Sequence, residues 1–134
     1  MSIEIIEASL SGSEARQRRP PGELLFMEGQ APEGIYILHS GTVELFFTAR
    51  NGSPKTLRIA ERGHILGLST VVMHHDHECS AMTVTECEVG FIDRDDLLRA
   101  LAEKPAVWFS VLGILSRDVN EAYDDMRAVS AMTR

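Results

Sequence analysis

The sequence has 134 residues, of which 44% are hydrophobic and 25% are charged, and its formal net charge at pH 7 is −7. This length suits one globular domain with a sizeable buried core. An acidic chain repels the phosphate backbone, so no direct nucleic-acid binding is expected. The sequence lacks an apolar run of about 18 residues, so no membrane-spanning helix is expected either.

Residues 1–22 are predicted to form an N-terminal arm that leads into the first strand. The segment begins Met-Ser-Ile-Glu, without a basic region or an apolar signal core, which indicates a cytoplasmic protein. Cys79 and Cys87 are the only cysteines. Two cysteines in a chain without a leader are expected to be reduced thiols, and Cys87, in an apolar strand context, is expected to be buried.

Residues 23–104 are predicted to form one unit, in which short apolar runs up to residue 92 are separated by turn residues. Asn51-Gly52 stands between two of these runs and predicts a hairpin, because both residues tolerate a positive φ. Many short strands without intervening helices indicate a mainly β fold, a jelly roll or sandwich, rather than an α/β fold. A short helix is expected to follow, with acidic residues at 93, 95 and 96 at its N-terminus and leucines at 97, 98 and 101 on its apolar face.

Residues 105–134 are predicted to form a long C-terminal helix that Pro105 opens. Its apolar residues are spaced by three and four positions, and they are Leu112, Leu115, Val119, Ala122, Met126 and Val129. A monomeric amphipathic helix shows the same stripe, but so narrow a seam fits a two-helix dimer contact better. We therefore expect a homodimer through this helix, and we expect Trp108 and Phe109 to pack the helix onto the β domain.

Four segments, in this order along the chain, resemble the sensor domain of Crp/Fnr-type regulators. Residues 22–29 resemble the opening strand and glycine turn of that family, and residues 35–43 its next hairpin. Residues 63–81 match the frame of its phosphate-binding cassette, and residues 88–94 resemble the strand that enters the following helix. The resemblance covers about residues 20–130. It implies a double-stranded jelly roll, or β-roll, flanked by helices, with the last helix as the dimerisation helix.

The cassette supplies the candidate ligand-binding residues, and they are Gly67, Leu68, Ser69, Cys79, Ser80 and Ala81. The family pattern places a Glu at position 68 and an Arg at position 79, where this chain has Leu and Cys. Losing both charged hydrogen-bonding groups predicts a degenerate cyclic AMP site. The alternative, which the sequence favours, is that residues 67–69 form a turn that packs Leu68 into the roll.

Residues 74–79 (His-His-Asp-His-Glu-Cys) form the densest set of metal-ligand types in the chain. A His-x-His on a jelly roll is similar to the cupin pattern, but the Glu and the later His of that pattern are missing. Adjacent residues cannot all turn to one metal, so the stretch is predicted to be a polar loop with solvated histidines and no metal. His39 and His64 are expected to be structural. No catalytic motif is present, so neither an enzyme nor a resident cofactor is expected.

These observations predict the ligand-sensing (effector) domain of a Crp/Fnr-family transcriptional regulator with a degenerate cyclic AMP site. A small-molecule effector and a second copy of the chain are its expected partners. Two alternatives remain, namely a stand-alone dimeric interaction module that has lost its ligand and, further away, a cupin-like metal-binding protein.

Overall fold

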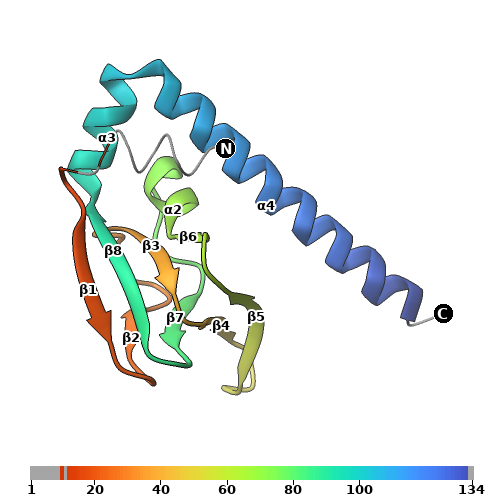
Figure 1. The fold of residues 1–134 in the computed structure, drawn as a ribbon. Helices are drawn as coiled ribbons and strands as arrows, with labels where there is room; N and C mark the ends of the chain where they lie inside the picture. Colours follow the sequence, from red (N-terminus) through yellow and green to blue (C-terminus); the bar gives the residue numbers. More distant parts are fainter. Residues whose placement is uncertain (1–9, 11, 133–134) are drawn as a thin grey trace.

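The computed structural model describes residue 10 and residues 12–132, without the side chains at 119, 121–123 and 125–132. Eight strands and three helices follow one another along this part of the chain (Figure 1). The strands are β1 (Ala15–Arg19), β2 (Leu24–Phe26), β3 (Gly34–Ser40), β4 (Val43–Thr48), β5 (Pro54–Ala60), β6 (Ile65–Leu66), β7 (Ser80–Thr83) and β8 (Cys87–Asp93). The helices are α2 (Leu68–Met73), α3 (Arg94–Glu103) and α4 (Pro105–Met132).

The strands form two antiparallel four-stranded sheets, with the orders β1-β8-β3-β6 and β2-β7-β4-β5. This arrangement confirms the predicted mainly β fold of two sheets with accompanying helices. Residues 1–22 were expected to be an arm ahead of the first strand. However, residues 15–19 are themselves strand β1, paired with β8 along its whole length.

Strand β3 is buried on both faces, and it separates two apolar cores. Ile35 and Ile37 belong to a core shared with α2, α3 and α4, whereas Tyr36 and Leu38 point into the roll. Side chains of a strand alternate between its faces, so one strand serves both cores. The sheet that contains β3 therefore lies between the helices and the second sheet.

The predicted hairpin at Asn51-Gly52 is observed as the turn between β4 and β5. Gly52 has a φ of 85°, and the side-chain oxygen of Asn51 accepts a hydrogen bond from the Ser53 amide at 3.0 Å. The predicted helix start after residue 92 is also observed. The Asp93 carboxylate caps α3 by accepting from the Asp95 amide at 2.9 Å.

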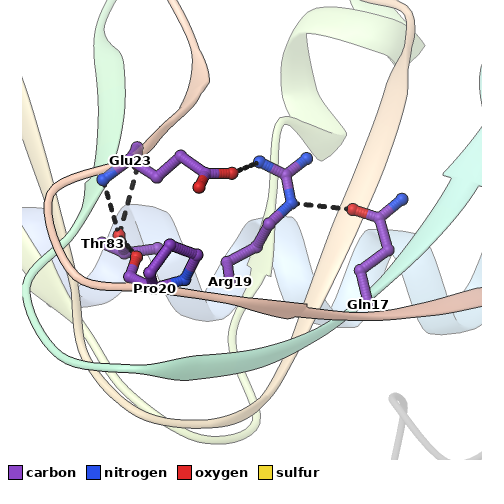
Figure 2. Close-up of polar contacts among 5 residues, drawn as sticks. All are labelled: Gln17, Arg19, Pro20, Glu23 and Thr83. Atoms are coloured by element: carbon purple, nitrogen blue, oxygen red, sulfur yellow. Dashed lines mark hydrogen bonds and ion pairs between the residues drawn. The ribbon is translucent and has the colours of Figure 1, made fainter.

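Polar side chains tie the turn between β1 and β2 to β7, as Figure 2 shows. The guanidinium of Arg19 pairs with the Glu23 carboxylate and donates to the Gln17 side-chain oxygen at 2.9 Å. The Thr83 hydroxyl donates to the Pro20 carbonyl at 2.7 Å and accepts from the Glu23 amide at 2.9 Å. These bonds fix the corner where the chain passes from one sheet to the other.

Helix α4 meets the β domain through Val107, Val111 and Ile114, which are buried with Ser110 on one side of the helix. The prediction that Trp108 and Phe109 would do this is wrong, because their side chains are 41% and 76% exposed. A helical turn of 3.6 residues puts positions 107, 111 and 114 on one face and turns 108 and 109 away from it. The C-terminal part of α4 extends away from the two sheets (Figure 1).

Substituting Gly34 with alanine is expected to destabilise the fold by about 1–3 kcal/mol, through overpacking. A Cβ at this position would lie 2.2 Å from the Ile92 carbonyl oxygen in the neighbouring strand, and that backbone atom cannot move aside cheaply. The free energy of urea unfolding measures the effect. Gly12→Ala is the matched control, because its Cβ would meet no atom within 4 Å. Equal stability of the two variants would contradict the close approach.

Candidate ligand-binding site

A cavity of about 210 Å³ lies where the β4–β5 hairpin, α2, the segment before β7 and α4 come together. Its apolar lining residues are Phe26, Leu45, Leu57, Ile65, Leu66, Gly67 and Leu68. Its polar lining residues are Ser69, Thr70, His77, Glu78, Cys79 and Asp118. The structure thus gathers four of the six candidate residues (67, 68, 69 and 79) around one cavity.

The start of the cassette is the N-terminus of the six-residue helix α2. Gly67 stands before it with a φ of 85°, a conformation that suits glycine, and its carbonyl accepts the Thr70 hydroxyl at 2.9 Å. Leu68, the first residue of α2, is 2% exposed and belongs to the core between the β3 sheet and the helices. Leu68 is therefore a buried core residue, although it starts a helix and not the predicted turn between strands.

The end of the cassette divides its three candidate residues between cavity and core. Cys79 lines the cavity and is half-buried, and burial, helped by the carboxylates of Glu78 and Glu28, raises the pKa of its thiol. The Ser80 hydroxyl accepts the Glu28 amide at 2.9 Å, and Ala81 is fully buried in the roll. Neither Ser80 nor Ala81 lines the cavity; both belong to strand β7, which begins directly after Cys79.

The prediction that the histidines of residues 74–79 are solvated is wrong for His77, because His77 is only 5% exposed. Its ring stacks on Phe26, with centroids 3.9 Å apart and planes at 13°, and Nδ1 lies 3.3 Å from the Thr70 hydroxyl. The backbone of His77 also bonds to Gln30 and Gly29, at 2.9 and 2.8 Å. Burial lowers the pKa of His77, with nearby Asp76 acting in the opposite direction and His75 in the same one.

The other two histidines of this stretch do point outward. His74 ends α2 with a φ of 58°, and His75 lies 3.8 Å from the Glu78 carboxylate in an exposed pair. Within residue 10 and residues 12–132, no group of three or more His, Cys, Asp or Glu side chains converges as a metal site would require. Residues 74–79 thus occupy exposed, half-buried and buried positions and do not converge on one point.

A second cavity of about 240 Å³ shares two lining residues, Phe26 and His77, with the first. Its other lining residues come from β1, β2, β3, β8 and the loop before β3, and they are Gln17, Leu25, Gln30, Ala31, Glu33, Gly34, Tyr36 and Phe91. Burial raises the pKa of Tyr36, an effect that the Arg19 guanidinium opposes. The Phe26–His77 stack is therefore the common wall of two polar-lined spaces.

Sequence reasoning missed nine lining residues of the first cavity, namely Phe26, Leu45, Leu57, Ile65, Leu66, Thr70, His77, Glu78 and Asp118. Leu45 and Leu57 come from the neighbouring strands β4 and β5 and look like any apolar strand residue. Asp118 lies nearly forty positions beyond the cassette, on α4. The helical period groups position 118 with 107, 111 and 114 on one face of α4, but the sequence does not show that this face meets the cavity.

Two sheets rolled over an apolar interior, with a short helix and a long closing helix beside a cavity, define a β-roll. Comparison with known proteins agrees with that class. The sequence profile of the cyclic nucleotide-binding domain matches residues 16–104. The chain therefore belongs to the cyclic nucleotide-binding domain family.

The similar proteins include Crp-type regulators. The chain is 30% identical over 108 residues to the cyclic AMP receptor protein of Thermus thermophilus, covering 79% of this chain and 50% of that protein. It is 27% identical over 107 residues to a CRP-like cAMP-activated global transcriptional regulator of Mycobacterium tuberculosis. That match covers 80% of this chain and 48% of that protein. The chain thus spans about half the length of these relatives.

Solved structures agree with the fold. The catabolite activator protein of Thermus thermophilus superposes with a TM-score of 0.79 at 27% identity, over 95% of this chain and 59% of that chain. A cyclic nucleotide-binding domain of Methylobacillus flagellatus gives a TM-score of 0.80 at 20% identity, over 89% of this chain and 69% of that chain. No helix in the described part of the chain is long and apolar enough to cross a membrane.

The buried position of His77 predicts a stability that falls as the pH drops below about 6.5, the ordinary pKa of histidine. The unfolded chain then takes up a proton that the folded site resists, so the unfolded state binds more protons and gains population. His77→Phe keeps an aromatic ring on Phe26 but removes the titrating group. Its free energy of unfolding should therefore fall less than that of the wild type between about pH 7.5 and about pH 5.5.

Urea unfolding at both pH values measures this difference, with His74→Phe as the control, because His74 is exposed and is not among the groups that act on the pKa of His77. The control should keep the pH dependence of the wild type. Parallel pH profiles for the wild type and His77→Phe would mean that burial does not govern the titration of His77.

Proposed function

We propose that this chain is the effector domain of a Crp/Fnr-family transcriptional regulator in which the cyclic AMP site has degenerated and another small molecule is sensed. The observation that carries the proposal is the lining of the 210 Å³ cavity. It contains Leu68 and Cys79 at the two positions where the resemblance places the charged Glu and Arg. The sequence similarity to Crp-type regulators supports the role of an effector domain. The Leu and Cys in the cavity lining support a ligand other than cyclic AMP.

Two features of the cavity oppose a cyclic phosphate. No Arg or Lys is among its described lining residues, so an anion would lose water without gaining a charge-assisted hydrogen bond. Leu68 faces the core shared with the helices, so no carboxylate is available at that position for a ribose hydroxyl. The cavity itself is retained, and a retained cavity favours a sensing role over an interaction module without a ligand.

The position of the cavity suggests how its occupancy reaches the rest of a regulator. Asp118 of α4 lines it together with residues of the roll and of α2. A ligand that contacts both sides favours one placement of α4 relative to the roll, which is a shift between conformational states. In a dimer joined through α4, the two long helices would transmit that shift.

The same helix offers a surface for the second copy. Trp108 and Leu112 are 41% and 55% exposed, and Leu115 is half-buried next to them along the helix. Trp108 extends the predicted seam by one position at the same spacing, since it lies four residues before Leu112. The other seam residues, Val119, Ala122, Met126 and Val129, have side chains outside the described set, and their role remains part of this proposal.

The wild-type protein is expected to bind cyclic AMP at least about a hundredfold more weakly than an intact site of this family, because two charge-assisted hydrogen bonds of about 1.5–3 kcal/mol each are missing. Cys79→Arg should strengthen binding by about tenfold, because it returns one such bond to a half-buried position. Calorimetric titration with cyclic AMP measures both proteins. A micromolar dissociation constant for the wild type would overturn the degenerate-site proposal.

Cys79→Gln is the matched control for the cyclic AMP titration of Cys79→Arg, because it adds a long polar side chain without a charge. It should leave cyclic AMP binding as weak as in the wild type. Leu68→Glu is not expected to help, since its carboxylate would be buried among apolar side chains and would cost stability.

A dimer held by α4 predicts that Leu112→Asp dissociates the protein. Two carboxylates would then enter an apolar contact, where desolvation and repulsion both oppose them, and each dimer would lose the burial of two leucines, worth about 1.5–3 kcal/mol each. Light scattering at micromolar concentration measures the mass. Asn120→Asp adds the same charge at an exposed position on another side of α4 and should leave the dimer intact. A monomeric wild type would overturn this part of the proposal.

A further inference from the structure

The charges around the 210 Å³ cavity have the opposite sign from those that a cyclic phosphate needs. Its described lining residues include two carboxylates, Glu78 and Asp118, and no Lys or Arg. Burial lowers the pKa of His77 and raises the pKa of Cys79, so both side chains are neutral near pH 7. The formal charges on the lining are therefore negative only, in a chain whose net charge is already −7.

The two carboxylates are not equivalent. The Glu78 side chain is 81% exposed and lies near His75, so water screens most of its field at the cavity. Asp118 is half-buried and stands on α4. Asp118 already takes part in an interaction, but a carboxylate has about four acceptor positions and can accept a further N–H donor.

The remaining wall of the cavity suits a flat apolar ring. Phe26 carries the stacked ring of His77 on one side, and Leu45 and Leu57 come from the β4–β5 hairpin. Aromatic rings pack well against such a stack and against leucine side chains. An apolar cavity of about 150 Å³ is known to hold benzene, so a space of about 210 Å³ suits a ligand with one or two fused rings.

We propose that this cavity binds a small aromatic amine, with its ring against Phe26, Leu45 and Leu57 and its ammonium group at the Asp118 carboxylate. The inference rests on the proposed function and names the ligand class of the same site. Because the ring contacts the roll and the ammonium contacts α4, such a ligand joins the two parts whose relative placement the effector domain controls. An anion with the same ring is rejected by the carboxylates.

Three indole compounds that share a ring and differ in charge test the proposal on the wild-type protein, namely tryptamine, 3-methylindole and indole-3-acetate. Calorimetry at pH 7 should give a dissociation constant for tryptamine at least about tenfold below that for indole-3-acetate, with 3-methylindole between them. Indole-3-acetate binding as tightly as tryptamine, or no binding by any of the three, would overturn the proposal.

Two variants separate the ammonium contact from the ring contact. Asp118→Asn should weaken tryptamine binding about fivefold to tenfold while leaving 3-methylindole unchanged. Leu57→Trp should weaken both compounds by filling the cavity, and Ile59→Trp, on the same strand but outside the lining, should weaken neither. Unchanged tryptamine binding in Asp118→Asn would overturn the assignment to this carboxylate.

The outcome is separable from that of the proposed function. The cyclic AMP titration and the mass of Leu112→Asp use no aromatic amine, so they test the degenerate site and the α4 dimer on their own. If cyclic AMP binds weakly, Leu112→Asp dissociates the dimer and tryptamine does not bind, the proposed effector domain stands and only the ligand class is wrong.

Discussion

The two-sided burial of β3 is the constraint on which the rest of the molecule depends. Ile35 and Ile37 pack against the three helices, while Tyr36 and Leu38 pack inside the roll. Each fully buried aliphatic side chain contributes about 1.5–3 kcal/mol, so neither face of this strand tolerates a polar residue. The helices and the second sheet are consequently held by the same strand, and the cassette helix α2 stays close to both.

The Phe26–His77 stack is the second element on which the site depends. Its two residues line both cavities, and its histidine is fixed by the Thr70 hydroxyl and by backbone bonds to the loop before β3. The stacked imidazole gives the 210 Å³ cavity a flat wall. The described lining of that cavity combines apolar side chains with two carboxylates and contains no Lys or Arg.

Helix α4 has two different apolar faces, and this division suits a helix that both docks and assembles. Val107, Val111 and Ile114 are buried against the domain, while Trp108, Phe109 and Leu112 remain exposed within the single chain. Asp118 lies on the side turned to the cavity. One helix therefore touches the domain core, the candidate ligand space and the surface proposed for a second copy.

The sequence by itself determined the elements whose causes are local. Alternating apolar runs indicated the strands, Asn51-Gly52 the hairpin, and Asp93 with its acidic neighbours the start of α3, because each signal acts over only a few residues. It also identified Leu68 and Cys79 as the departures from the family pattern, since that comparison needs only their positions in the cassette frame.

Tertiary structure alone decided which of several similar side chains is buried. His74, His75 and His77 look alike in the sequence, but only His77 lies where the chain re-enters the roll beside Phe26. Trp108 and Phe109 looked like core residues, yet the smaller Val107, Val111 and Ile114 set the rotation of α4, because packing depends on the shape of the opposing surface. Asp118 reaches the cavity through the docking of α4, a long-range contact that no local pattern encodes.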